Sequence, residues 1–265
     1  MAPEPRDEMR GYVGSGKLAG RTALVTGGDS GIGRAVCCAF AKEGADVAIA
    51  YLSEHEDAEH TRRLVEAEGR RALTLACDLQ REQECRRIVE ETVRRLGSLD
   101  VLVNHVGTQT PVDAPEEISS EQWDGTFRTN VYSYFWTARA ALEQMREGAS
   151  IINTGSVNGL RGNRSLIDYA ASKGAVHVLT SSLAQALIDR GIRVNCVAPG
   201  PVWTPLIPAT FPEAKVEQFG KQVPMGRAAQ PDEIAPSYVF FASNELSSYY
   251  TGEVLAPIGG ETLPG

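Results

Sequence analysis

The sequence predicts a single-domain α/β protein built on a doubly wound parallel sheet with helices on both faces. Short apolar runs alternate along the chain with longer amphipathic segments, which is the pattern of strands joined by crossover helices. A glycine-rich turn separates the first apolar run from the first amphipathic segment. Neither an internal repeat nor a linker divides the 265 residues, so one domain is the economical interpretation.

Seven apolar runs are expected to form the strands. Each is short, rich in valine, isoleucine, leucine or alanine, and most end near glycine or a charged residue. In chain order these strands span residues 21–28, 46–52, 72–79, 99–107, 149–156, 192–200 and 252–260.

Six segments with apolar residues at helical spacing are expected to form the helices. In chain order they span residues 31–45, 56–69, 82–97, 122–145, 169–188 and 231–243. The first of them stops at Gly44, and glycine commonly follows the end of a helix. The proline-rich stretch from Pro199 to Pro224 interrupts the alternation of strands and helices, and we expect it to contain a lid that closes over a substrate.

The composition bears on where the protein is located and on which partners it binds. The chain is 42% hydrophobic and 23% charged, and no apolar run approaches the ~20 residues that span a bilayer. Its N-terminus lacks the apolar core of a signal peptide, so we expect a cytoplasmic protein without a membrane partner. A net charge of −8 provides no general positive field for nucleic acid.

Cysteine and histidine spacing predicts reduced thiols and no metal. The five cysteines contain no C-x-x-C pair, and most have apolar neighbours. The four histidines form no short-spaced ligand set.

The turn "GGDSGIG" over residues 27–33 has the composition of a phosphate-binding loop. Gly27, Gly31 and Gly33 lie between the first strand and the first helix, where glycine permits positive φ and close approach of a ligand to the backbone. A helix that begins near Gly31 directs free N–H groups at an anion, which suits a pyrophosphate. An ordinary strand-to-helix turn is the alternative. No G-K-[ST] follows, which disfavours phosphoryl transfer.

The end of the second strand bears on the choice between NAD and NADP. NAD-binding folds usually place an acidic residue there to hold the ribose hydroxyls, and this chain has Tyr51 instead. No arginine stands at Asp29 or Ser30, and the segment beyond Tyr51 is acidic. We favour NADP(H) over NAD(H). The candidate partners of a 2′-phosphate are Arg34, Arg62 and Arg63.

Several motifs in a fixed order resemble those of the short-chain dehydrogenases/reductases, from about Lys17 to the C-terminus. They are the glycine loop, "NHVG" at 104–107, "PGPVWT" at 199–204, and the polar residues Asn130, Ser156, Tyr169 and Lys173. The sequence around the loop further resembles that of a bacterial subgroup labelled glucose/ribitol dehydrogenase-like or general-stress oxidoreductases.

The resemblance implies a Rossmann-like fold, with a dinucleotide-binding catalytic domain over 18–265, a lid at about 199–224 and a partly ordered N-terminal extension over 1–17. Within the family, Asp78 corresponds to the aspartate that contacts the adenine ring. The implied cofactor contacts are Gly27, Asp29, Ser30, Gly31, Ile32, Gly33, Tyr51, Asp78, Leu79, Asn104, Gly107, Tyr169, Lys173, Pro199, Gly200, Val202 and Thr204.

The segment "IDYAASK" places Tyr169 and Lys173 four residues apart, on one face of an expected helix. We expect the ammonium to lower the pKa of the tyrosine toward the working pH, which suits an acid–base catalyst. The resemblance implies that Ser156 binds the substrate oxygen, that Lys173 holds the nicotinamide ribose, and that Asn130 completes a proton relay. Taken singly, each has a structural alternative, such as a cap or a surface pair.

These residues together predict an NAD(P)-dependent oxidoreductase acting on a small-molecule carbonyl/alcohol couple. A dinucleotide-dependent epimerase or dehydratase and a noncatalytic dinucleotide sensor are the alternatives. The candidate substrate-pocket residues are His105, Gln109, Asn158, Arg161, Trp203 and Leu206. His105 and Val106 depart from the family's usual Asn and Ala, and His105 has either a pocket or a structural role. The resemblance and an aromatic helix also indicate a homo-oligomer, a tetramer or a dimer.

Overall fold

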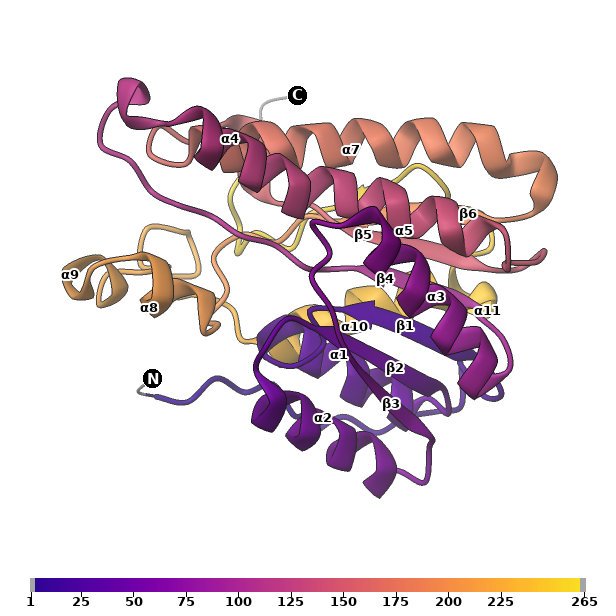
Figure 1. Ribbon diagram of the computed structural model, residues 1–265. Coiled ribbons are helices and arrows are strands. Elements are labelled where there is room, and N and C mark those ends of the chain that lie inside the picture. The colour runs from indigo at the N-terminus through magenta and orange to yellow at the C-terminus, as the bar shows by residue number, and fades with distance from the viewer. Residues whose placement is uncertain (1–2, 263–265) are drawn as a thin grey trace.

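Seven parallel strands form the central sheet of the computed structural model, which describes residues 3–262 (Figure 1). Their order is β3-β2-β1-β4-β5-β6-β7, so the chain moves outward from β1 in one direction and then returns to build the other half. The predicted doubly wound parallel sheet is confirmed. The strands are β1 (Thr22–Thr26), β2 (Asp46–Tyr51), β3 (Ala72–Ala76), β4 (Val101–Asn104), β5 (Ser150–Thr154), β6 (Arg193–Val197) and β7 (Val254–Leu255).

Helices cover both faces of this sheet (Figure 1). The longer ones are α1 (Gly31–Lys42), α2 (His55–Ala67), α3 (Glu82–Leu96), α4 (Ser120–Phe127), α5 (Ser133–Leu142), α7 (Ile167–Leu187) and α10 (Pro231–Ala242). The shorter ones are α6 (Val157–Arg161), α8 (Leu206–Thr210), α9 (Glu213–Val216), α11 (Asn244–Ser247) and the 3-10 turns η1 (Pro115–Glu117) and η3 (Ile188–Arg190).

The two faces of the sheet bury different sets of side chains. Ala23 and Val25 of β1 pack with α1 and α10, whereas Leu24 between them packs with α3, α5 and α7. This alternation follows from the two-residue period of a strand. It explains why the predicted strands read as continuous apolar runs, since both faces are covered.

Two expected elements differ from the prediction. The single helix expected over 122–145 is divided by a π-helical turn, η2 (Arg128–Tyr132), between α4 and α5. The strand expected over 252–260 pairs with β6 only at Val254–Leu255. Pro257 lacks an N–H to continue the ladder, and Gly259 and Gly260 take positive φ.

Part of the N-terminal segment packs on the domain. Asp7 and Met9 are 4% and 2% exposed, and residues 7–9 form hydrogen bonds with α1, α2 and α10. A charged, proline-containing segment gave no periodic signal for this packing, because each contact involves a single residue.

All five cysteines are buried and unpaired, as predicted. Within residues 3–262, no group of three or more His, Cys, Asp or Glu side chains is arranged to hold a metal ion. No helix in that range is long and apolar enough to cross a membrane.

Candidate active site

A cavity of about 1390 Å³ lies at the carboxyl ends of the strands. The loops after β1, β3, β4, β5 and β6 contribute to its walls, together with α4, α7 and α8. β1 and β4 are neighbours at the point where the strand order reverses, which is where doubly wound sheets bind their ligands.

The loop between β1 and α1 presents backbone N–H groups at this cavity. Gly27 and Gly31 have φ values of 69° and 54°, in the left-handed region that favours glycine. A Cβ on Gly33 would lie 1.8 Å from the carbonyl oxygen of Gly27, so only glycine lets α1 begin this close to β1. Among the described residues, the amides of Ile32 and Gly33 have no hydrogen-bond partner. Such free donors at a helix N-terminus fit the pyrophosphate of a dinucleotide.

Most residues expected to contact the cofactor line the cavity. They are Gly27, Asp29, Ser30, Gly31, Ile32, Tyr51, Asp78, Leu79, Gly107, Tyr169, Lys173, Pro199, Gly200, Val202 and Thr204. Gly33 and Asn104 do not line it. Gly33 shapes the loop from behind, and Asn104 is 1% exposed and donates to the Tyr134 carbonyl oxygen and to Asn153 Oδ1.

The three arginines considered for a 2′-phosphate lie outside the cavity wall. Arg34 is 9% exposed and pairs with Asp7 and Asp57. Arg62 forms ion pairs along α2, and Arg63 donates to a carbonyl oxygen of the same helix. The expectation that one of them faces the cofactor is therefore not met, because each is engaged by groups nearer to it.

Tyr169, Lys173 and Ser156 meet at the cavity. Tyr169 and Lys173 lie one turn apart on α7, and Lys173 Nζ is 5.8 Å from the centroid of the Tyr169 ring. Ser156 caps α6, and its Oγ accepts a hydrogen bond of 3.1 Å from the amide of Asn158.

Lys173 is buried, with 2% of its surface exposed, yet it forms no ion pair among the described residues. Its Nζ donates to the carbonyl oxygen of Thr154 at 2.8 Å and to the hydroxyl of Tyr134 at 3.2 Å. These two contacts join α7 to the end of β5 and to α5, and they hold the amine beside Tyr169.

Asn130 lies in the π-helical turn and is fully buried. Its Oδ1 accepts from the Thr108 amide at 2.8 Å, and its Nδ2 donates to the Thr108 carbonyl oxygen at 2.9 Å and to Ser172 Oγ at 3.0 Å. Asn130 therefore holds the loop after β4 against α7 and does not itself line the cavity. A wide turn of this kind often occurs where a helix residue has a function.

The expected lowering of the tyrosine pKa is not what the structure shows. Burial raises the pKa of Tyr169, and the hydrogen bond with Ser156 only partly opposes that shift. The same burial lowers the pKa of Lys173 to about 8, since no carboxylate compensates for desolvation of its ammonium. The charge on the lysine thus changes as the pH passes through about 8.

His105 lies on the cavity wall, and its Nδ1 is 3.1 Å from Thr154 Oγ1. Burial and the neighbouring Lys173 lower the pKa of His105 to about 3, so the ring is neutral near pH 7. His105 therefore lines the pocket and also contacts Thr154 of β5.

Motif matching missed three residues that support the site: Thr154, Tyr134 and His177. His177 Nε2 accepts from the Ser156 amide at 3.4 Å, and its ring occupies space that a Cβ on Gly155 would fill. No local signal distinguishes these residues from other buried polar groups, because their partners lie on other elements.

Apart from His105 and Trp203, the other four substrate-pocket candidates all line the cavity: Gln109, Asn158, Arg161 and Leu206. Gln109 Nε2 donates to Thr210 Oγ1 at 2.9 Å, which ties the loop after β4 to α8. Arg161 is paired with Glu261 at 2.6 Å. Trp203 is not part of the wall, because its indole N–H donates to the Pro3 carbonyl oxygen.

A family model described as Enoyl-(Acyl carrier protein) reductase matches residues 27–262. Together with the relatives described next, this match shows that the chain belongs to the short-chain dehydrogenase/reductase family. The resemblance inferred from the motifs is confirmed.

Two relatives and one solved structure illustrate the likeness. General stress protein 39 of Bacillus subtilis is 54% identical over 260 residues, which cover 98% of this chain and 91% of that protein. NADPH-dependent aldehyde reductase 1, chloroplastic, of Arabidopsis thaliana is 49% identical over 269 residues, covering 99% and 93%. The crystal structure of a short-chain dehydrogenase from Burkholderia cenocepacia in complex with NADP has a TM-score of 0.86 and 33% identity, covering 92% and 98%.

The depressed pKa of Lys173 predicts a pH-dependent stability. Between pH 8 and about 10.5 the unfolded chain binds a proton at this position that the folded amine does not, so Lys173 contributes a rise in the free energy of unfolding with pH across this window. The five buried cysteines, whose pKa values are raised by burial, contribute in the opposite direction. In urea denaturation at several pH values, the free energy of unfolding should therefore rise more, or fall less, with pH in the wild type than in Lys173→Met. Lys221→Met, at an exposed site, controls for the loss of one positive charge. Equal pH dependence in wild type and Lys173→Met would contradict the prediction.

Proposed function

We propose that the protein is an NAD(P)-dependent oxidoreductase that transfers a hydride between a nicotinamide cofactor and a small-molecule carbonyl/alcohol substrate. The observation that carries this proposal is the meeting of Tyr169, Lys173 and Ser156 in the cavity that the glycine loop also enters. Membership of an oxidoreductase family supports the same reaction class.

Ser156 is proposed to hold the carbonyl oxygen of the substrate. Its Oγ already accepts the amide hydrogen of Asn158, so the hydroxyl hydrogen is available to donate into the cavity. A fixed donor there stabilises the negative charge that develops on the oxygen during reduction. His177 supports this placement through the Ser156 amide.

Tyr169 is proposed as the general acid/base, delivering a proton to the substrate oxygen in reduction and removing it in oxidation. The bound cofactor supplies the hydride chemistry. Lys173, held by Thr154 and Tyr134, is proposed to bind the nicotinamide ribose. When the lysine is protonated, its positive charge favours the tyrosinate form of Tyr169. Asn130 is proposed to link the lysine to solvent through the loop at Thr108.

NADP(H) is the proposed cofactor, in preference to NAD(H). The NADPH-dependent relative and the NADP-bound structural neighbour support it, as does the presence of Tyr51 in place of an acid at the last position of β2. The hydroxyls of Ser30 and Tyr51 are the proposed donors to a 2′-phosphate.

Three carboxylates on the cavity wall, those of Asp29, Glu54 and Asp57, oppose the preference for NADP(H), because negative charge repels a 2′-phosphate. Their effect is reduced in two ways. Asp57 is paired with Arg34 at 3.1 Å, and burial raises the pKa of Asp29. Among described residues, the cations on the wall are Arg161, Arg164, Lys173 and Lys215, none of which follows β2.

A homo-oligomer, dimeric or tetrameric, is part of the proposal. Trp123 of α4, Tyr132 of η2 and Phe135 of α5 are each more than 40% exposed, which is unusual for aromatic side chains on adjacent helices. The buried, unpaired thiols suit the proposed cytoplasmic location, where disulfides are rare, and cell fractionation checks it.

The oligomer proposal predicts that light scattering will give a molar mass of two or four chains. Phe135→Glu should lower that mass, because a carboxylate cannot be buried in an apolar interface. Val13→Glu, at an exposed apolar site elsewhere on the chain, is the control. A wild-type mass of one chain would contradict the proposal.

Replacing Tyr169 with phenylalanine tests the reaction itself. The variant should lose turnover by about 10³-fold, because acid–base catalysis typically contributes 10²–10⁴-fold, while binding of the cofactor is kept. Absorbance of the reduced nicotinamide, followed over a panel of aldehydes, ketones and alcohols, measures turnover. Tyr250→Phe is the control. A Tyr169→Phe protein with normal turnover at saturating cofactor would refute the assignment, and turnover without net NAD(P)H change would favour an epimerase.

The cofactor preference predicts that kcat/KM with NADPH exceeds that with NADH by about tenfold or more for one carbonyl substrate. Tyr51→Asp should reverse the preference, since it places a ribose-binding acid at the end of β2 and adds charge against a 2′-phosphate. Equal or better use of NADH by the wild type would contradict the prediction.

A further inference from the structure

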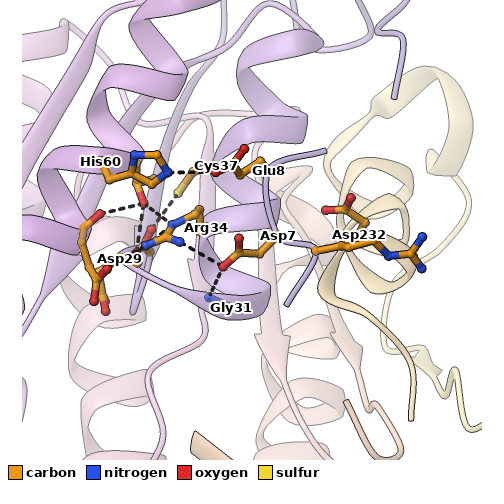
Figure 2. A network of polar contacts seen from close by, with 12 residues as sticks. Asp7, Glu8, Asp29, Gly31, Arg34, Cys37, His60 and Asp232 are labelled. Carbon is orange, nitrogen blue, oxygen red and sulfur yellow. Dashed lines mark hydrogen bonds and ion pairs between the residues drawn. The ribbon is translucent and has the colours of Figure 1, made fainter. Parts of the chain in front are cut away.

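The N-terminal residues 3–12 form a strap across the beginning of α1, between α2 and α10 (Figure 2). Two hydrogen bonds fasten it to the start of α10: Arg6 N to Gln230 Oε1 at 2.9 Å, and Met9 N to Asp232 Oδ1 at 3.0 Å. On the other side, Glu8 accepts from His60 of α2 at 3.0 Å.

Asp7, at the centre of the strap, contacts the phosphate-binding loop directly. Its Oδ2 accepts a hydrogen bond of 3.0 Å from the amide of Gly31 and lies 3.2 Å from Arg34 Nη1 (Figure 2). The side chain is 5% exposed, and Asp7 is not among the residues that line the cavity. The Asp7 carboxylate therefore contacts the loop without forming part of the cavity wall.

Arg34 transmits this contact to the rest of the loop. Its guanidinium donates twice to the carbonyl oxygen of Asp29, at 2.7 and 3.1 Å, and once to Thr61 Oγ1 at 3.1 Å. Asp29 itself lies on the cavity wall. Asp7, Arg34 and the Asp29 carbonyl thus form a chain of contacts that sets the position of the loop relative to α2.

The strap adopts a conformation that its own sequence does not favour. Met9 has a φ of 53°, the one positive value recorded for a residue other than glycine in the described part of the chain. Such a conformation is unfavourable for a residue other than glycine and persists only where surrounding contacts determine it. Here the Met9 side chain is 2% exposed within the core cluster of α1 and α10, and its amide is bonded to Asp232.

The strap also reaches the segment that contains the proposed lid. The carbonyl oxygen of Pro3 accepts from the Trp203 indole N–H at 2.8 Å. Trp203 lies between Val202 and Thr204, both of which line the cavity. One short segment therefore contacts the loop at one end of the cavity and the proposed lid at another.

We propose that Asp7 is a positioning residue for the cofactor, which holds the phosphate-binding loop in its binding conformation through Gly31 and Arg34. The inference rests on the proposed function, since it concerns the same dinucleotide. Because Asp7 accepts from the Gly31 amide, the neighbouring amide of Ile32, on the cavity wall, remains as a donor for the pyrophosphate. Arg34 balances its negative charge, so that the carboxylate does not repel the phosphates.

The test compares Asp7→Asn and Asp7→Ala with Glu8→Gln in the full-length protein. Glu8→Gln removes the same charge from the neighbouring residue, whose carboxylate contacts Arg10 and His60 and not the loop. Fluorescence titration with NADPH and with NADH measures the dissociation constants, and circular dichroism verifies that each variant is folded. Steady-state kinetics at saturating cofactor measure kcat.

Asp7→Ala should raise the dissociation constant about tenfold, equivalent to ~1.4 kcal/mol, with kcat within about twofold of wild type. Asp7→Asn should give a smaller rise, because its amide oxygen still accepts from Gly31, and Glu8→Gln should give none. A lower melting temperature with unchanged dissociation constants would overturn the proposal in favour of a purely structural role. Tighter binding in the Asp7 variants would overturn it too, since Asp7 would then compete with the cofactor.

Failure of the proposed function has a different signature in the same experiment. In that case the wild-type protein itself binds neither NADPH nor NADH. If the wild type binds a cofactor and Asp7→Ala binds it equally well, only the role of Asp7 is lost.

Discussion

The close approach of α1 to β1 is the constraint on which the rest of the molecule depends. The Gly33 backbone lies so near the Gly27 carbonyl oxygen that a Cβ would overlap it at 1.8 Å. This contact brings the N-terminus of α1 to the carboxyl end of the central strand, where the order of the sheet reverses. Ile32, whose amide is free, consequently lies on the cavity wall, and Asp7 of the N-terminal strap accepts a hydrogen bond from the neighbouring Gly31 amide.

A second constraint is the burial of the Lys173 amine without a carboxylate. Its partners are a carbonyl oxygen of β5 and a phenol of α5, both neutral, so desolvation dominates and its pKa falls to about 8. A lysine in this state changes charge under mild conditions. The two neutral histidines nearby, His105 and His177, add no positive charge, and they bond to Thr154 at the end of β5 and to the Ser156 amide just beyond it.

The strands and most helices could be predicted from the sequence because their signals are local. Val25 and its neighbours form an apolar run that any parallel sheet would bury, and Gly44 ends α1 within its own segment. The division at η2 could not be predicted, since 122–145 has continuous helical character and the wide turn depends on how Asn130 bonds to Thr108. The packing of the strap could not be predicted from the sequence either, because Asp7 contacts residues more than twenty positions away.

The features of the candidate site likewise fall into two groups, those set by local sequence and those set by tertiary structure. Glycine spacing, the i, i+4 pair of Tyr169 with Lys173 and the order of the motifs are properties of the chain itself, so the sequence was sufficient to locate the glycine loop and to indicate the family. Tertiary structure alone decided that Arg34 turns to Asp7 and not to a ligand, that Trp203 lies outside the cavity, and that burial raises the pKa of Tyr169. Desolvation and long-range hydrogen bonds set these outcomes, and both arise only when distant segments come together.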